Sequence, residues 1–385
     1  MKHQTQTGKP DPLTTRCLAI AGGLLHNPTA PRFEDLPKAY IRQFVADRPA
    51  LGCREDKAGN LLVRYRACGG RGTPVVLVAH MDHPGFRVEA VRGKTLRLRF
   101  QGYVVPPHGR AGQRIRLFRR GQVEPLGVAE LTKVAYERNR IAQVSAKVVS
   151  GTAVEADFAM WDFPAYRETG GRIVACNCDD GMGTAAALCV LDEMVRRRPK
   201  NVVVQVLFTR AEELGFLGAL EAIRLRTVPK RAVVISLEAS KALPHAPQGG
   251  GVIVRVGDRE SVFNPEVTHA LQAAAVHVAR RDPDFRFQRR LMDGGACEAT
   301  PFYVAGYRAS GVAIPLGNYH NQSISDNGTA GVGAEHVCIR DFVDEVRLLT
   351  EFVRHAEKYL KPNAALAVWL RKFTRTARKV LASKP

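Results

Sequence analysis

The sequence predicts an α/β fold: a three-layer αβα catalytic domain with a mostly parallel sheet, into which a small β-rich domain is inserted. The first reason is that apolar runs at 75–79, 201–208 and 231–240 lack the alternation of a half-buried strand. Such runs are typical of strands that helices cover on both faces. The second reason is that helical periodicity follows these runs, as at 187–195, and strand–helix alternation favours a parallel sheet.

The third observation is a change of pattern between about residues 88 and 166. Alternating apolar and polar stretches at 95–105, 113–121 and 142–154 are separated by Gly and Pro turns, and helical periodicity is scarce. This pattern predicts a small all-β module within the larger domain. The predicted organisation is a catalytic domain in two parts, an inserted β-rich domain and a basic tail: residues 1–87 with 167–360, 88–166, and 361–385.

Taken in chain order, the other elements fit this organisation. Residues 14–50 are predicted to be helical around a loop at 26–37, and the turn residues at 55–60 precede a strand at 61–66. The second part of the catalytic domain continues the alternation after the insert. It has a strand at 172–177, a helix from 184, a short helix from 216, strands near 249–258, 285–290 and 310–321, and helices at 265–280 and 337–359.

The composition argues against a membrane-spanning protein and against a secreted, disulfide-rich one. The net charge is +20, from 57 Lys and Arg against 37 Asp and Glu, which indicates either anionic partners or simply a basic solvated surface. No apolar run approaches the roughly 18 residues of a membrane span. The eight cysteines lack the spacing of a disulfide framework, and the N-terminus is a poor secretory signal. We therefore expect reduced thiols and a cytoplasmic protein.

Two pairs of adjacent acids stand at the ends of predicted elements: Asp179–Asp180 before a helix and Glu212–Glu213 after a strand. Adjacent carboxylates repel each other, and a cation between them removes that cost. His80, Glu238 and His320 also follow buried strands, and functional groups at the carboxyl ends of parallel strands converge. Two imidazoles and several carboxylates suit Zn²⁺, Co²⁺ or Mn²⁺, and five ligands with one bridging suit two metals roughly 3.5–4 Å apart.

Longer motifs surround these residues, in the order VVLVAHMDHPGF, CDDGMG, FTRAEELGFLGA, VISLEAS, GGGVIVRVGDRESVFNP and GGACEATPFYVAGYRASGVAIPLGNYHN. In these motifs the chain resembles the glutamyl aminopeptidase and tetrahedral (TET) aminopeptidase family of di-metal exopeptidases, over about residues 15–358. The resemblance implies a metal-dependent aminopeptidase that removes N-terminal residues from short peptides. It implies two divalent metal ions per subunit, zinc foremost, with cobalt or manganese as alternatives. It also implies a homo-oligomer, with the insert as a dimerisation domain.

Position by position, the resemblance also implies a ligand set. Asp179 would bridge the two metals. His80 and Glu238 would complete one metal site, and Glu213 and His320 the other. The family usually has Asp where Glu238 stands, and the longer side chain can still reach a metal.

The resemblance implies further roles outside the ligand set. Glu212 would be the general base, which takes a proton from the attacking water and passes it to the leaving amine. Asp82 would hydrogen-bond on the His80 side and so fix the tautomer of that ligand. Glu298 stands where an acid near the substrate amine is expected. His83 occupies a position where the family often has a carboxylate or an amide, so a different pocket rim is expected.

Other functions stay open on the residues alone. The same metal centre could serve a deacylase of N-acyl amino acids or a hydrolase of modified dipeptides. A GxGxxA match at 181–186 is typical of dinucleotide binding, but Asp179 and Asp180 would repel a pyrophosphate there. A non-catalytic protein could use the +20 charge to bind nucleic acid or membrane.

The tail at 363–384 is predicted to be a basic amphipathic helix. Its apolar residues share one face, and its basic residues lie elsewhere: Leu366, Leu370, Phe373, Ala377 and Leu381 against Arg371, Lys372, Arg375, Arg378 and Lys379. Such a helix can lie on an anionic membrane or bind an acidic partner. The alternatives are a helix docked on its own subunit and a solvated end.

Overall fold

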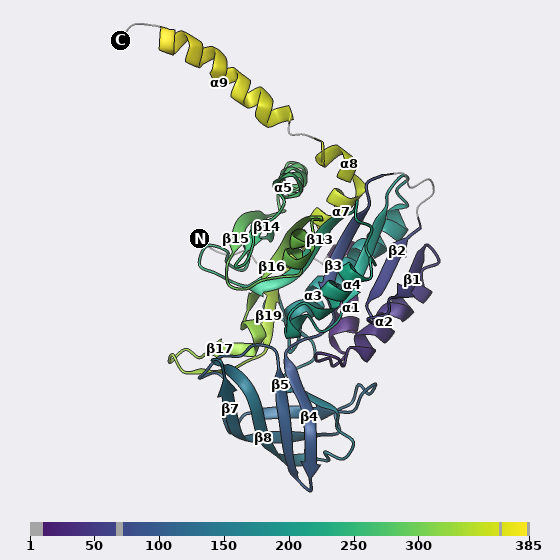
Figure 1. The fold of residues 1–385 in the computed structure, drawn as a ribbon, viewed down its shortest axis with the longest axis vertical. Coiled ribbons are helices and arrows are strands. Elements are labelled where there is room, and N and C mark those ends of the chain that lie inside the picture. Colours follow the sequence, from purple (N-terminus) through teal and green to yellow (C-terminus); the bar gives the residue numbers. More distant parts are fainter. Residues whose placement is uncertain (1–10, 67–71, 362–363, 383–385) are drawn as a thin grey trace.

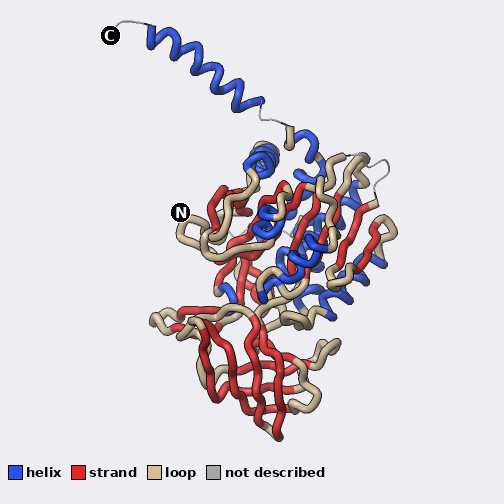
Figure 2. Tube along the Cα trace, in the orientation of Figure 1, coloured by secondary structure: helices blue, strands red, loops and turns tan. Residues whose placement is uncertain are grey.

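The computed structural model describes residues 11–66, 72–361 and 364–382, and it has three parts that Figure 1 separates clearly. A helix-covered sheet forms the largest part, a β-barrel lies at one end, and helix α9 (Ala364–Ala382) projects at the opposite end. Figure 2 shows strands almost alone in the barrel and helices mixed with strands in the main part. The predicted α/β fold with a mostly parallel central sheet is confirmed.

The central strands of the sheet are parallel neighbours, and antiparallel strands extend the sheet on both sides. The central order is β12 (Val204–Thr209), β3 (Val75–His80), β13 (Val233–Lys241) and β16 (Arg308–Gly317). The outer strands are β2 (Leu61–Tyr65) and β1 (Leu51–Glu55) beyond β12, and β19 (Glu335–Cys338), β11 (Arg172–Ala175) and β10 (Arg167–Thr169) beyond β16. In addition, β14 (Val252–Asp258) pairs with both β16 and β15 (Phe287–Met292).

Helices cover both faces of this sheet, which explains the unbroken apolar runs in the sequence. Along β3, Val75, Leu77 and Ala79 pack into one core, whereas Val76 and Val78 pack into the other. The first core includes residues of α1 (Pro12–Leu25), α2 (Asp35–Ala46), α3 (Cys178–Arg197), α5 (Pro265–Ala279) and α7 (Ile339–Arg354); the second includes residues of α4 (Leu217–Arg224) and α6 (Ala299–Val304). Apolar burial on both faces stabilises the three layers.

The β-rich insert forms a closed barrel in the order β4-β5-β8-β7-β6-β9. The ranges are β4 (Gly85–Arg92), β5 (Thr95–Gln101), β6 (Arg114–Phe118), β7 (Gly127–Glu137), β8 (Arg140–Gly151) and β9 (Phe158–Trp161). Inside it, the buried Trp161 indole packs edge-on against Phe86, with ring centroids 4.8 Å apart. Closure leaves the barrel no unpaired strand edge. Its first strand begins at Gly85, slightly before the predicted boundary at residue 88.

One predicted helix is wrong as a single element. The sequence predicts a helix over 337–359, but residues 335–338 form β19, α7 ends at Arg354, and a short helix, α8, covers Ala356–Tyr359. The interruption lies at His355, whose φ of −131° and ψ of 24° are outside the helical region. The apolar periodicity continues across this break, which is why the sequence does not reveal it.

Two further properties apply to the described ranges. All the cysteines within them are free thiols, as the sequence predicts. Within the same ranges, no helix is both long and apolar enough to cross a membrane.

Candidate metal centre

The strand order brings the second acid pair beside the first candidate histidine. His80 is the last residue of β3, and it pairs in register with Thr209, the last residue of β12. The chain after Thr209 carries Glu212 and Glu213 in a short 3₁₀ turn. Because both strands run in the same direction, their ends and the groups that follow them meet at one edge of the sheet.

Asp179 and His320 reach this edge from two other elements. Asp179 stands at the start of α3, and its peptide bond to Asp180 is cis. His320 lies in the 3₁₀ turn that follows β16, and its ring stacks on Tyr319 with a centroid separation of 3.8 Å. Its Nδ1 lies 2.7 Å from the carbonyl oxygen of Tyr103, in the loop between β5 and β6. The inserted module therefore helps to orient a candidate ligand.

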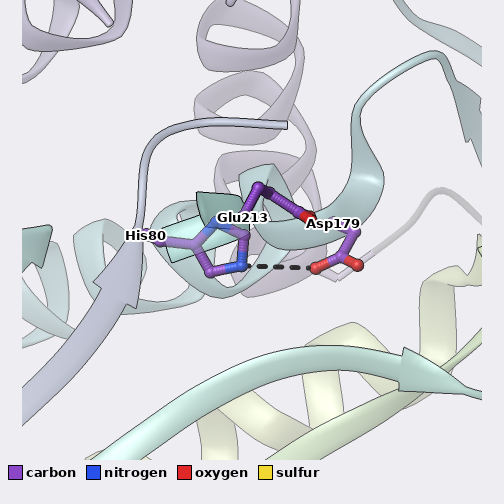
Figure 3. A group of neighbouring side chains, drawn as sticks. All are labelled: His80, Asp179 and Glu213. Carbon is purple, nitrogen blue, oxygen red and sulfur yellow. Dashed lines mark ion pairs between the residues drawn. The ribbon is translucent and has the colours of Figure 1, made fainter. Parts of the chain in front are cut away.

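Asp179 is the central group of the site. Its Oδ1 lies 3.4 Å from Nε2 of His80, and its Oδ2 lies 3.3 Å from Nε2 of His320. Glu213 Oε1 is 3.3 Å from the same His320 nitrogen, and Glu212 Oε2 is 3.9 Å from the His80 nitrogen. Figure 3 shows the side chains of His80, Asp179 and Glu213 gathered around one point. Each Asp179 oxygen thus faces a different imidazole.

Glu238 and Glu298 lie in an outer position. Neither forms an ion pair in the part of the chain that the structure describes, although the charges of both interact with His80. Glu238 is part of β13, and Glu298 immediately precedes α6. Both side chains are buried. The structure therefore gathers the candidate acids at one edge, with Glu238 and Glu298 further from the imidazoles than the others.

Burial of so many carboxylates makes the site costly without a cation. Burial raises the pKa of Glu238 to about 8 and that of Glu298 to about 7, and it raises the pKa of Glu212 well above its usual range. Burial also opposes ionisation of Asp179, but the imidazoles of His320 and His80 outweigh it and lower its pKa. A bound divalent ion would keep the acids ionised, because it stabilises their charged forms.

The donor atoms fit such an ion. One donor each from His80, Asp179 and Glu213 lies within 4.8 Å of the other two. Oδ1 of Asp179 is buried and has no hydrogen-bond partner among the described residues, which is costly unless a ligand occupies it. Imidazole nitrogens combined with carboxylate oxygens are ligands that Zn²⁺, Co²⁺ and Mn²⁺ accept.

Asp82 holds the acid pair Glu212–Glu213 through its main chain. The two carboxylate oxygens of Asp82 accept the N–H groups of Glu212 at 3.0 Å and Glu213 at 3.1 Å. The closer contact with His80 Nδ1 comes from the carbonyl oxygen of Asp82, at 3.0 Å, and not from its carboxylate, at 3.6 Å. Asp82 therefore positions the predicted general base and a predicted ligand at the same time, beyond its predicted contact with His80.

Two residues that hold Asp179 in place are not predictable from the sequence. His83, expected at the pocket rim, is fully buried instead, with Nδ1 2.6 Å from the carbonyl oxygen of Asp179 and Nε2 2.9 Å from Oδ1 of Asn321. Glu335, at the start of β19, accepts the N–H of Asp179 at 2.9 Å. A single histidine or acid carries no sequence signal for such contacts. The only indication is that His83 directly follows Asp82, close to the candidate ligand His80.

A small cavity adjoins the centre and contains a buried cation. Glu238 and Tyr319 line this cavity together with Lys241 and Arg255. Arg255 is 2% exposed and donates to Oγ of Ser240 at 3.1 Å. It forms no ion pair with any described residue, and its buried Nε has no hydrogen-bond partner there. Its charge interacts with that of Glu238 without forming an ion pair, so an anionic group in the cavity would give the buried guanidinium a closer partner.

Comparison with known sequences identifies relatives over most of the chain. The model of the M42 glutamyl aminopeptidase family matches residues 59–328. A putative aminopeptidase of Acetivibrio thermocellus is 24% identical over 306 residues, which cover 74% of this chain and 87% of that protein.

Solved structures share the fold. An aminopeptidase from the archaeon Desulfurococcus kamchatkensis superposes with a TM-score of 0.72 at 19% identity, covering 90% of this chain and 97% of that one. The TET1 peptidase of Pyrococcus horikoshii has a TM-score of 0.68 at 16% identity, covering 88% and 99%. Because the matching family model spans the gathered residues from His80 to His320, the chain belongs to the M42 glutamyl aminopeptidase family and is a metallo-aminopeptidase.

Proposed function

We propose that this chain hydrolyses the N-terminal peptide bond of short peptides with the help of two divalent metal ions. The observation that carries the proposal is the position of Asp179, whose two oxygens face His80 and His320 separately. A carboxylate in that position suits a bridging ligand. Glu213 would complete the site of His320, and Glu238 that of His80. Zinc fits these nitrogen and oxygen donors best, and cobalt or manganese would use the same residues.

The residues around the centre have separate tasks in this proposal. When bound, the metal ions would lower the pKa of the attacking water and stabilise negative charge on the carbonyl oxygen. Glu212 would take a proton from that water at Oε2 and give it to the leaving amine. Asp82 would keep Glu212 in place through the main-chain hydrogen bond described above. Glu298, buried at the same edge, would bind the free α-amino group of the substrate.

A panel of aminoacyl and N-acetyl-aminoacyl substrates tests this assignment. Substrates with a free amino group are expected to react about 10²-fold faster in kcat/KM, because an acylated amine cannot pair with a carboxylate. Glu298→Gln should raise KM for the free-amine substrates, whereas Glu260→Gln, at an exposed position, should not. Preference for the N-acetyl substrates would instead support the deacylase.

The same panel addresses the substrate side chain. The cavity that contains Arg255 and Lys241 adjoins the proposed metal site through Glu238 and Tyr319. An N-terminal Asp or Glu would bring a carboxylate to the buried guanidinium and give it an ionic partner closer than Glu238. We therefore expect Asp and Glu substrates to be cleaved with a higher kcat/KM than Leu substrates. Equal rates would show that the cavity does not receive the substrate side chain.

The proposal includes assembly into a homo-oligomer. The TET1 peptidase of Pyrococcus horikoshii assembles into a tetrahedron or a large octahedral shell. On this chain, the adjacent helices α4 and α6 expose apolar side chains, including Leu217, Leu220 and Val304 at 44%, 47% and 76% exposure. Neighbouring exposed apolar groups are typical of protein interfaces, so these helices are candidates for a subunit contact.

A further inference from the structure

Helix α9 is an amphipathic helix that stands apart from the rest of the molecule. Figure 1 shows it beyond α8, at the end of the molecule opposite the barrel. Its large apolar side chains are exposed: Trp369 by 53%, Phe373 by 55% and Leu381 by 84%. A helix that buries no apolar face against its own domain gains no stability from packing there. Its apolar side chains therefore need another environment.

Most of the large apolar residues of α9 lie on the side opposite its basic residues, whereas Val368, which is 47% exposed, lies on the basic side. At 3.6 residues per turn, six apolar residues form one stripe: Trp369, Leu370, Phe373, Ala377, Val380 and Leu381. Within that stripe the rings of Trp369 and Phe373 pack edge to face, with centroids 4.9 Å apart. The basic residues Arg371, Lys372, Arg378 and Lys379 occupy the other side.

All the charged side chains of the C-terminal segment, residues 361–385, are basic. Residues 361–385 contain seven Lys and Arg and no Asp or Glu. Of these, Arg371, Lys372, Arg378 and Lys379 form no ion pair with any residue that the structure describes. The helix therefore offers an unneutralised positive surface opposite its apolar stripe.

We propose that α9 binds the surface of an anionic phospholipid bilayer. An interfacial helix uses both of its sides at once, because its apolar stripe enters the acyl boundary while its Lys and Arg side chains contact anionic headgroups. Aromatic side chains such as Trp369 and Phe373 are suited to that boundary. The binding would be peripheral, since no helix among the described residues, α9 included, is long and apolar enough to cross a membrane.

Other occupants match these features less completely. Nucleic acid would neutralise the basic side and leave the aromatic stripe in water. A second copy of α9 would need a narrow seam flanked by charges of both signs, whereas this stripe is broad and the segment has no acid. Only an anionic surface with an apolar interior complements both sides.

The position of α9 is compatible with catalysis at the bilayer. The candidate metal centre lies next to the inserted module, because His320 contacts Tyr103 in the loop between β5 and β6. Figure 1 places the barrel and α9 at opposite ends of the molecule. A bilayer bound by α9 would therefore lie at the end of the molecule opposite the barrel that adjoins the candidate metal centre, and this inference does not depend on the proposed mechanism.

Flotation of the full-length protein with phospholipid vesicles tests the proposal. The protein is expected to float with phosphatidylcholine vesicles that contain phosphatidylglycerol, to stay behind with pure phosphatidylcholine, and to release as salt is raised. The double variant Leu370→Asp/Phe373→Asp should bind more than about ten-fold more weakly, since it removes two large apolar side chains from the acyl boundary and adds two carboxylates that anionic headgroups repel. The matched variant Thr374→Asp/Thr376→Asp adds the same charge outside the stripe and should retain most binding.

Aminopeptidase activity should be equal in all these proteins, which shows that the catalytic domain is folded. Equal loss of binding in both double variants would mean attraction by charge alone and would overturn the proposal. So would equal binding to both kinds of vesicle, or binding to polyuridylate or polyglutamate but not to vesicles. Self-association that disappears in Leu370→Asp/Phe373→Asp, without any vesicle binding, would assign the stripe to a second copy instead.

Discussion

Replacing Glu212 by glutamine is expected to lower kcat about 10²–10⁴-fold, which is the usual contribution of a general base. The amide keeps the size of the side chain but cannot accept a proton from the attacking water. The main-chain N–H of residue 212 can still donate to Asp82, at 3.0 Å in the native chain, so the turn should keep its shape. Steady-state kinetics should show a loss in kcat with little change in KM.

The matched control for this variant is Glu221→Gln, which makes the same chemical change at a half-buried position on α4, where Glu221 pairs with Arg224. It should retain native activity. Metal content measured on both proteins separates loss of the base from loss of a ligand, and both should bind the native amount. Native kcat in Glu212→Gln would remove the proton-transfer role from this residue.

Replacing Asp179 by asparagine should affect metal content as well as rate. The side chain keeps one oxygen and exchanges the other for an amide nitrogen, so it can no longer offer a carboxylate oxygen to each imidazole. Since the native oxygens lie 3.4 Å from His80 and 3.3 Å from His320, we expect the variant to lose one metal ion. Activity should fall by at least about 10²-fold, because both metals take part in such reactions.

Elemental analysis of the dialysed variant by mass spectrometry measures this effect. Asp326→Asn, in an exposed loop, is the control and should keep the native metal content. If Asp179→Asn retained the full metal content and native kinetics, Asp179 would not be a bridging ligand. A variant that binds no metal at all would show that the two sites cannot fill separately.

The architecture was predictable where burial leaves a regular pattern in the sequence. The apolar run at 75–79 predicts a strand covered on both faces, and its side chains do alternate between two cores. The break in the helix predicted over 337–359 was not predictable, because His355 changes the backbone without changing the periodicity. The alternating stretches of the insert indicate strands, but closure of the barrel depends on pairing between distant strands, such as β4 with β9.

In the candidate site, too, some features were predictable from the sequence and others were not. His80, Glu212 and Glu213 follow strands that pair in parallel, and so their proximity follows from the topology that the sequence predicts. The contacts of His83 and Glu335 with the main chain of Asp179 depend on loops that pack across the site. No local pattern encodes such contacts. The hydrogen bonds of Asp82 were missed for the same reason: the sequence predicts its place beside His80 and not its bonds to the turn after β12.

The central claim is that one carboxylate, Asp179, joins two metal sites. Its most direct test is a titration of the metal-free enzyme with zinc, in which bound metal and aminopeptidase activity are followed together. We predict that binding saturates at two zinc ions per chain and that full activity requires the second. Saturation of both binding and activity at a single ion per chain would contradict this account.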